Sequence, residues 1–239
     1  MSQKLDNQWD DRLAASMGEE ELLRYRSNLL GSDLRITNYG GGNTSAKIDM
    51  ADPLTGKIET ILWVKGSGGD LGSMGLDGFS TLYLDKLEQL KGLYRGLEHE
   101  DEMVGYLPHC TFNLNPRAAS IDTPLHAFIP QRHVDHMHPD AVIAIACTKN
   151  SKELTKEIFG GEMGWLPWQR PGFDLGLRLE EIAKSDKNLK GVVLEGHGLF
   201  TWAETSKDCY ENTLAILQRA ADWLAQHNKG EAFGGARYM

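Results

Sequence analysis

Hydrophobic positions recur along the chain with two different periods, which predicts a mixture of strands and helices. Apolar and polar residues alternate over Thr44–Met50 and Glu59–Lys65, the pattern of strands with one buried face. The turn-forming segment Asp52–Gly56 separates them, so we expect a β-hairpin. Further strands are expected over Ser80–Leu84 and over Gly191–Trp202, where a histidine flanked by glycines interrupts the apolar run.

Apolar residues spaced three or four apart predict the helices. A first helix is expected from a cap at Asp6 or Asn7 through Leu29, with Gly31 ending it. The clearest helix is Thr205–His227, because its apolar residues share one face. Other helices are expected over Asp85–Leu97, Asp101–Tyr106, Leu125–Ile129, Ala141–Ala146, Ser151–Ile158 and Phe173–Ala183.

These elements predict a single α/β domain over residues 1–239. The length allows a large hydrophobic core, and no internal repeat or interior linker divides the chain. The segment Met163–Gly172 holds two Trp and two Pro and is expected to be irregular. The glycine-rich end, about 229–239, is expected to be a flexible tail.

Charge and cysteine content narrow the class of protein. The net charge is −9 and no long Lys/Arg run occurs, so we expect no nucleic acid partner. No stretch reaches the roughly 18 apolar residues of a membrane span, and no apolar signal core begins the chain. Three widely spaced cysteines, Cys110, Cys147 and Cys209, do not form a disulfide framework. We therefore expect a soluble, cytoplasmic protein.

The candidate chemistry begins with His136 and His138, two residues apart. Residues at this spacing in a strand face the same side, and Pro139 favours an extended backbone before it, whereas His133 would face the other way. His197 is the third candidate, because catalytic zinc takes three protein ligands and keeps one position open. Taken singly, each histidine equally fits a polar residue at a strand end or in a turn.

Two glycine-rich loops are candidates for binding an anion. Gly40-Gly41-Gly42-Asn43 and Lys65-Gly66-Ser67-Gly68-Gly69 match neither the P-loop nor the dinucleotide-binding fingerprint. Backbone N–H groups of Gly42 and Gly68, with the side chains of Asn43, Ser45 and Ser67, would donate hydrogen bonds to a phosphate. Tight turns alone would also explain these glycines.

Asp122 has two interpretations. A carboxylate beside a metal is a natural general acid or base. Because Thr123-Pro124 follow it, the same residue also fits the N-cap of a helix.

Five short motifs, in this order, resemble the class II aldolase/adducin superfamily: Gly42-Asn43-Thr44-Ser45, Gly66-Ser67-Gly68, Ser120-x-Asp122, His136-x-His138-Pro139 and Gly196-His197-Gly198-Leu199. More closely, Ser120–His126 and His133–His136 look like the aldolase half of bifunctional rhamnulose-1-phosphate aldolase/short-chain dehydrogenases. The resemblance implies a central, mainly antiparallel sheet flanked by helices. It also implies a homotetramer with sites at the subunit interfaces.

The resemblance assigns roles residue by residue. It implies that His136, His138 and His197 hold Zn²⁺, although three imidazoles also suit Mn²⁺, Co²⁺ or Fe²⁺. It implies that a sugar phosphate is bound by Gly42, Asn43, Ser67, Gly68 and Ser120. The catalytic position falls on Asp122, where the smaller aldolases have glutamate, and Ile121 stands where a second phosphate-binding serine is expected.

The activity implied is zinc-dependent cleavage of L-rhamnulose 1-phosphate to dihydroxyacetone phosphate and L-lactaldehyde. Alternatives on the same scaffold are a fuculose-phosphate aldolase, a pentulose-phosphate 4-epimerase and a methylthioribulose-phosphate dehydratase. A non-catalytic adducin-like interaction module would lack the histidines. A metal-stabilised structural domain would need a fourth ligand, and Cys147, the nearest cysteine, is expected to pack in the core. Longer relatives continue into a dehydrogenase half, so such a domain could follow this chain in a longer natural protein. Without a nucleotide fingerprint of its own, we expect no hydride transfer from this chain.

Overall fold

Seven strands within the described residues form one sheet in the order β3-β2-β1-β4-β7-β6-β5, which confirms the predicted α/β fold. The structure is a computed structural model and describes residues 4–115, 117–228 and 230. Every neighbouring pair is antiparallel except β5 and β6, which are parallel. The strands are β1 (Asn43–Ala51), β2 (Ile58–Lys65), β3 (Phe79–Tyr83), β4 (His133–Met137), β5 (Met163–Leu166), β6 (Gly191–Leu194) and β7 (Gly198–Ala203).

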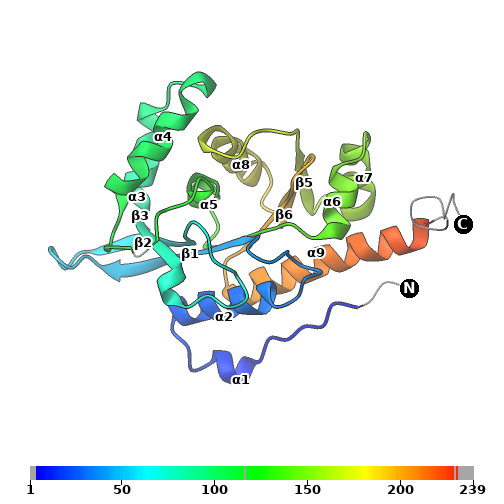
Figure 1. The fold of residues 1–239 in the computed structure, drawn as a ribbon, viewed down its shortest axis with the longest axis horizontal. Coiled ribbons are helices and arrows are strands. Elements are labelled where there is room, and N and C mark those ends of the chain that lie inside the picture. Colours follow the sequence, from blue (N-terminus) through cyan, green and yellow to red (C-terminus); the bar gives the residue numbers. More distant parts are fainter. Residues whose placement is uncertain (1–3, 116, 229, 231–239) are drawn as a thin grey trace, which may run out of the picture.

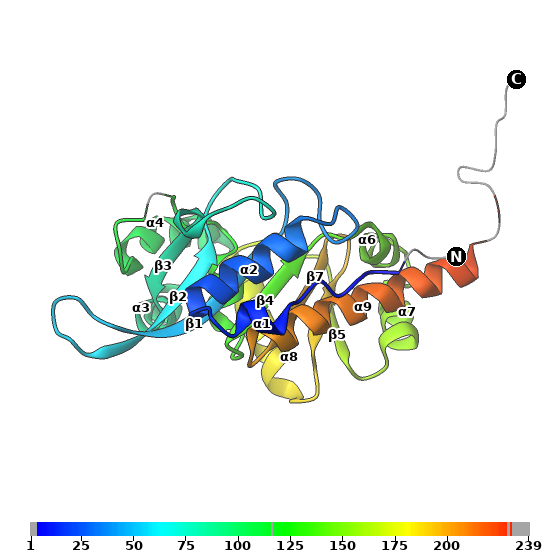
Figure 2. The ribbon, with the colours of Figure 1, turned by 90° about the horizontal axis from the view of Figure 1, so that it is seen from below.

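Helices cover both faces of the sheet (Figures 1 and 2). On one face, α2 packs on β1 and α9 packs on β7. On the other face lie α3, α5 and α8 (Figure 1). The α-helices are α1 (Asp11–Ala14), α2 (Glu19–Gly31), α3 (Leu84–Gln89), α4 (Glu100–Tyr106), α5 (Thr123–Phe128), α6 (Asp140–Ala146), α7 (Ser151–Phe159), α8 (Phe173–Ser185) and α9 (Ser206–His227). Short 3₁₀ turns lie at Leu76–Gly78, Leu90–Leu93, Leu97–His99 and Leu107–Cys110.

The N-terminal segment predicted as one helix forms two, so that prediction is wrong. The cap of α1 is Asp10, whose side chain accepts hydrogen bonds from two backbone N–H groups, rather than Asp6 or Asn7. Gly18, in an extended conformation, stands immediately before α2. Helix α1 ends at Ala14, and glycine, with its low helix propensity, keeps the chain extended before α2 although apolar spacing continues across the break.

Two further segments differ from prediction. The helix expected over Asp85–Leu97 ends at Gln89 and passes into a 3₁₀ turn, before Gly96 takes a positive φ of 98°. The segment from Met163, expected to be irregular, begins with strand β5. Its partner β6 lies far along the chain, so the pairing leaves no local pattern to detect. The predicted hairpin, β1–β2, is confirmed.

Strand β4 lies in the middle of the sheet, and its alternate residues point to opposite faces. On the α2/α9 face, Arg26 of α2 and Asp135 form an ion pair of 2.9 Å, with both side chains fully buried. Arg26 also donates to the carbonyl of Ser45, and Thr213 of α9 donates to Asp135. His133 lies on this same face, as predicted, and contacts Arg26. This polar network joins α2, β1, β4 and α9.

No helix within the described residues is long and apolar enough to cross a membrane. The tail predicted to be flexible, 229–239, lies outside the described residues except for Gly230. The interpretation of the whole chain as one domain stays a prediction.

Candidate metal centre

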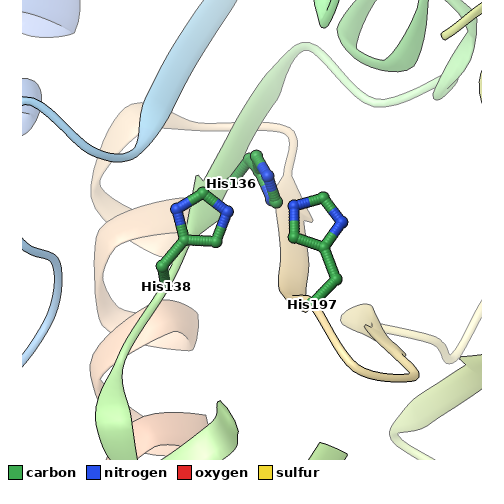
Figure 3. Close-up of side chains that lie close together, drawn as sticks. All are labelled: His136, His138 and His197. Carbon is green, nitrogen blue, oxygen red and sulfur yellow. The ribbon is translucent and has the colours of Figure 1, made fainter. Parts of the chain in front are cut away.

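Three histidines from two separate segments converge on one point. His136 belongs to β4, His138 follows that strand directly, and His197 lies in the turn before β7. Their ligand nitrogens all lie within 4.8 Å of one another, and Figure 3 shows the three rings pointing toward a common point. Among the described residues no other His, Cys, Asp or Glu joins this group. Three nitrogen donors without a fourth protein ligand match an open, catalytic type of site.

The environment fixes His136 in the form that binds metal. Its Nδ1 lies 2.9 Å from the carbonyl oxygen of Leu199, and a carbonyl only accepts, so Nδ1 carries the proton and Nε2 keeps its free electron pair. The ring stacks on Phe200 at 4.1 Å. Burial, with the neighbouring His138 and His197, holds the pKa of His136 well below its usual range. Burial also lowers the pKa of His138 to about 4 and lowers that of His197. All three rings are therefore neutral at pH 7.

The positions on either side of His197 require glycine for two different steric reasons. Gly196 takes a φ of +64°, in the left-handed region that favours glycine, and its N–H donates to the carbonyl of Ala146. A Cβ at Gly198 would lie 2.6 Å from the carbonyl oxygen of Met137 and 2.9 Å from the ring of His138. The glycine therefore allows the start of β7 to approach the end of β4, which brings His197 beside His138.

The first glycine loop borders the histidines. A Cβ built on Gly41 would lie 3.7 Å from Nδ1 of His138. Asn43 is the antiparallel partner of His136, and its side-chain amide donates to the carboxylate of Asp122. The structure thus places Asp122 one side chain away from the strand that carries the histidines.

Asp122 occupies the N-cap position of α5, but its side chain forms no capping hydrogen bond. Burial raises the pKa of its carboxyl group, while the hydrogen bond from Asn43 and the charge of Lys65 oppose that shift. The missing capping hydrogen bond does not support the N-cap interpretation of this partly buried carboxylate. The acid/base role of Asp122 stays a prediction.

The second glycine loop meets the segment that leads to Asp122. The N–H of Ser67 donates to the carbonyl of Ala118 over 2.9 Å, and Gly68 takes a φ of +72°. Ser120 Oγ accepts a hydrogen bond from the Asp122 N–H at 3.3 Å. Ser67, Gly68 and Ser120 therefore lie on the Asp122 side of the candidate site, whereas Gly42 and Asn43 lie beside the histidines. Ser45, also named as a donor, is buried and its Oγ lies 2.8 Å from Nδ1 of His126. Phosphate binding by these residues stays a prediction.

Sequence reasoning missed some neighbours of the site and misplaced one. Cys147, expected in the core, is exposed at the end of α6, so that prediction is wrong. The helix is short and its apolar face ends before that position. Phe200 was not singled out, and its only sequence signal is its place three residues after His197. Lys65, 4% exposed at the end of β2, lies near Asp122, and Arg117 lies near Lys65.

Comparison with known proteins gives several similar chains. An uncharacterized oxidoreductase, YuxG, from Bacillus subtilis is 45% identical over 234 residues, which are 97% of this chain but 33% of that protein. The chain thus spans about a third of the length of this curated relative. The solved N-terminal class II aldolase domain of a conserved protein from Thermoplasma acidophilum is 31% identical with a TM-score of 0.80, covering 92% of this chain and 99% of that domain.

More distant structures share the fold. The L-fuculose-1-phosphate aldolase from Thermus thermophilus is 15% identical with a TM-score of 0.54, covering 87% of this chain and 93% of that one. The chain also matches the family described as the class II aldolase and adducin N-terminal domain over residues 22–224. Because that match spans most of the chain, the protein belongs to the class II aldolase and adducin N-terminal domain family.

Proposed function

We propose that this protein is a metal-dependent aldolase that cleaves L-rhamnulose 1-phosphate to dihydroxyacetone phosphate and L-lactaldehyde. The observation that carries the proposal is the convergence of three histidines, beside which Asn43 of the first glycine loop donates to the partly buried carboxyl of Asp122. The choice of sugar rests on the resemblance of Ser120–His126 and His133–His136 to the bifunctional rhamnulose-phosphate enzymes.

His136, His138 and His197 would hold the ion, and we propose zinc, with Mn²⁺, Co²⁺ and Fe²⁺ as alternatives. When bound, the ion supplies Lewis-acid polarisation of the substrate's oxygens. The protein contributes a set of donors that needs no deprotonation at neutral pH, because burial keeps the rings uncharged.

Asp122 would move the proton. Its carboxylate accepts the proton of the C4 hydroxyl group, and the electron pair of that O–H bond forms the aldehyde carbonyl of lactaldehyde as the C3–C4 bond breaks. The C3–C4 electron pair stays on the dihydroxyacetone phosphate half, and a proton returned to C3 completes the reaction. Asn43, by donating to Asp122, orients the carboxylate for this transfer. Gly42, Asn43, Ser67, Gly68 and Ser120 would position the phosphate.

We also propose that the protein acts in the cytoplasm as a homotetramer. A longer natural chain, in which a dehydrogenase domain follows residue 239, is supported by the length of YuxG and by its description as an oxidoreductase.

Metal content and aldolase activity, measured on the same samples, test the proposal. Wild type, His197→Ala and the surface control His99→Ala are purified without chelators, analysed for bound metal and assayed with L-rhamnulose 1-phosphate. About one zinc per chain and cleavage are expected in wild type and His99→Ala, and both are expected to be lost in His197→Ala. If the wild type binds zinc but does not cleave L-rhamnulose 1-phosphate, the substrate proposal is wrong, and fuculose, pentulose and methylthioribulose phosphates are assayed next. Absence of metal from wild type contradicts the aldolase and favours the adducin-like interaction module.

A further inference from the structure

Arg117, which belongs to none of the five sequence motifs, lies against the second glycine loop. Its Nη1 donates to the carbonyl of Ser67 at 3.4 Å. Its guanidinium atoms lie 3.5–3.6 Å from the point where a Cβ of Gly69 would be, so the group rests over the loop backbone. A guanidinium has five N–H donors, so this single contact leaves others for a ligand.

The backbone of Arg117 is anchored from two sides. Ser80 Oγ donates to the carbonyl of Arg117 over 2.8 Å, and the N–H of Ser67 donates to the carbonyl of Ala118. A Cβ at Gly66 would lie 2.8 Å from Cβ of Arg117, so the glycine is what permits this close approach. The position of the side chain therefore follows from the fold of the glycine loop.

A second cation lies nearby with little exposure to water. Lys65 is 4% exposed, and the charge of Arg117 is among the causes that lower its pKa, after burial and opposed by Asp122. Neither cation forms an ion pair with a carboxylate of the described residues. The two acids whose charges act on Lys65 have other hydrogen-bond partners, since Asp122 accepts from Asn43, and Asp70 accepts from the Gly40 N–H and from Ser73.

Two neighbouring positive charges without an ion-pair partner favour a ligand that carries two negative charges. The protein as a whole is acidic, with a net charge of −9, so attraction of an anion must come from such a local site. Ile121, which is 37% exposed on the same segment, has no side-chain hydrogen-bond donor. Arg117 supplies two guanidinium N–H donors and a positive charge, which the side chain of Ile121 lacks.

We propose that Arg117 is a specificity-determining residue that binds the phosphate group of the substrate with its guanidinium fork and selects phosphorylated over unphosphorylated ketoses. The inference rests on the proposed function, because it concerns the substrate of the same site. Arginine suits this role better than lysine, since its planar fork matches two phosphate oxygens at once. Because Arg117 contacts the end of the substrate away from the breaking bond, its loss should raise KM more than it lowers kcat.

The test uses Arg117→Met, Arg117→Lys and the control Arg170→Met, which removes an exposed arginine paired with Asp101. In Arg117→Met, kcat/KM for L-rhamnulose 1-phosphate is expected to fall roughly 10- to 100-fold, the range of a hydrogen bond to a charged group. Cleavage of unphosphorylated L-rhamnulose should stay within about two-fold of wild type. Arg117→Lys should be intermediate, and Arg170→Met unchanged. An equal loss on both sugars, or no loss on either, would overturn the proposal.

Inorganic phosphate binding, measured by calorimetry, separates this inference from the aldolase proposal. Wild type should bind phosphate and Arg117→Met should bind it at least 10-fold more weakly, whether or not any sugar is cleaved. If wild type cleaves no ketose phosphate but loses phosphate affinity with Arg117, the reaction is wrong and the anion site stands. If wild type and Arg117→Met bind phosphate equally, Arg117 does not bind the phosphate group. Should Arg117→Met fail to fold, Arg117→Lys is compared with wild type in the same way.

Discussion

Replacing Arg26 by Met should destabilise the protein far more than an ordinary loss of an ion pair. The side chains of Arg26 and Asp135 are both fully buried and lie 2.9 Å apart. Without Arg26, Asp135 keeps only neutral donors, Thr213 at 3.0 Å and the thiol of Cys209 at 3.3 Å. Removing one partner of a buried pair leaves an uncompensated charge and costs about 3–5 kcal/mol. That loss is a large share of the roughly 5–15 kcal/mol by which domains are stable.

The control is Arg35→Met, which removes a partly exposed pair with Asp33 and should cost about 0–1 kcal/mol. Unfolding in urea is followed by tryptophan fluorescence at one protein concentration, in the presence of a chelator so that metal binding does not contribute. The double variant Arg26→Met/Asp135→Leu should be less destabilised than the sum of the two single variants, because no buried charge remains. If the free energies of unfolding of Arg26→Met and Arg35→Met agree within about 1 kcal/mol, the reasoning is refuted.

Three other predictions concern the site and the sheet. Asp122→Asn should lower kcat by about 10²–10⁴-fold while metal content stays at the wild-type level, and equal turnover would remove Asp122 from the reaction. In the pH profile of kcat/KM, the acid limb should lie above the usual range of an aspartate, since burial raises the pKa of Asp122. Asn43→Ala removes a hydrogen bond that stabilises the carboxylate, so this limb should move to still higher pH, and a shift downward would contradict that sign. Gly191→Ala should lower the free energy of unfolding in urea by about 1–3 kcal/mol, because its Cβ would lie 2.2 Å from the carbonyl oxygen of Phe200. The control Gly92→Ala has open space around the added Cβ and should not destabilise the protein.

The sequence predicted the parts of the fold that leave a local pattern. The hairpin β1–β2 and helix α9 follow from periodicity, and both are confirmed. Strand β5 was missed because four residues are too few for a period, and its parallel pairing with β6 depends on a distant segment. The break between α1 and α2 was missed because apolar spacing continues across Gly18.

The sequence predicted those residues of the candidate site whose type and spacing are unusual, and missed those whose type is common and whose partners are distant in the chain. Two histidines at strand spacing and a third between glycines stand out in a sequence, and the structure brings them together. The hydrogen bond from Asn43 to Asp122 joins residues 79 positions apart and has no local signal. Arg117 was missed for the same reason: arginines are frequent, and only the fold places this one on the glycine loop.

In strand β4 the candidate ligand His136 stands next to Asp135, the acid of the buried ion pair, and the two point to opposite faces. This arrangement restricts how the protein can change in evolution. Substitutions at His136 can alter the chemistry, while those at Asp135 act on folding, so tolerance along the strand should vary with a period of two. An insertion or deletion of one residue in β4 would exchange the faces of Asp135 and His136, so that the carboxylate would point toward the candidate site and the imidazole toward α2 and α9. New activities on this scaffold can therefore arise by point substitution in β4, whereas changes in its length are excluded.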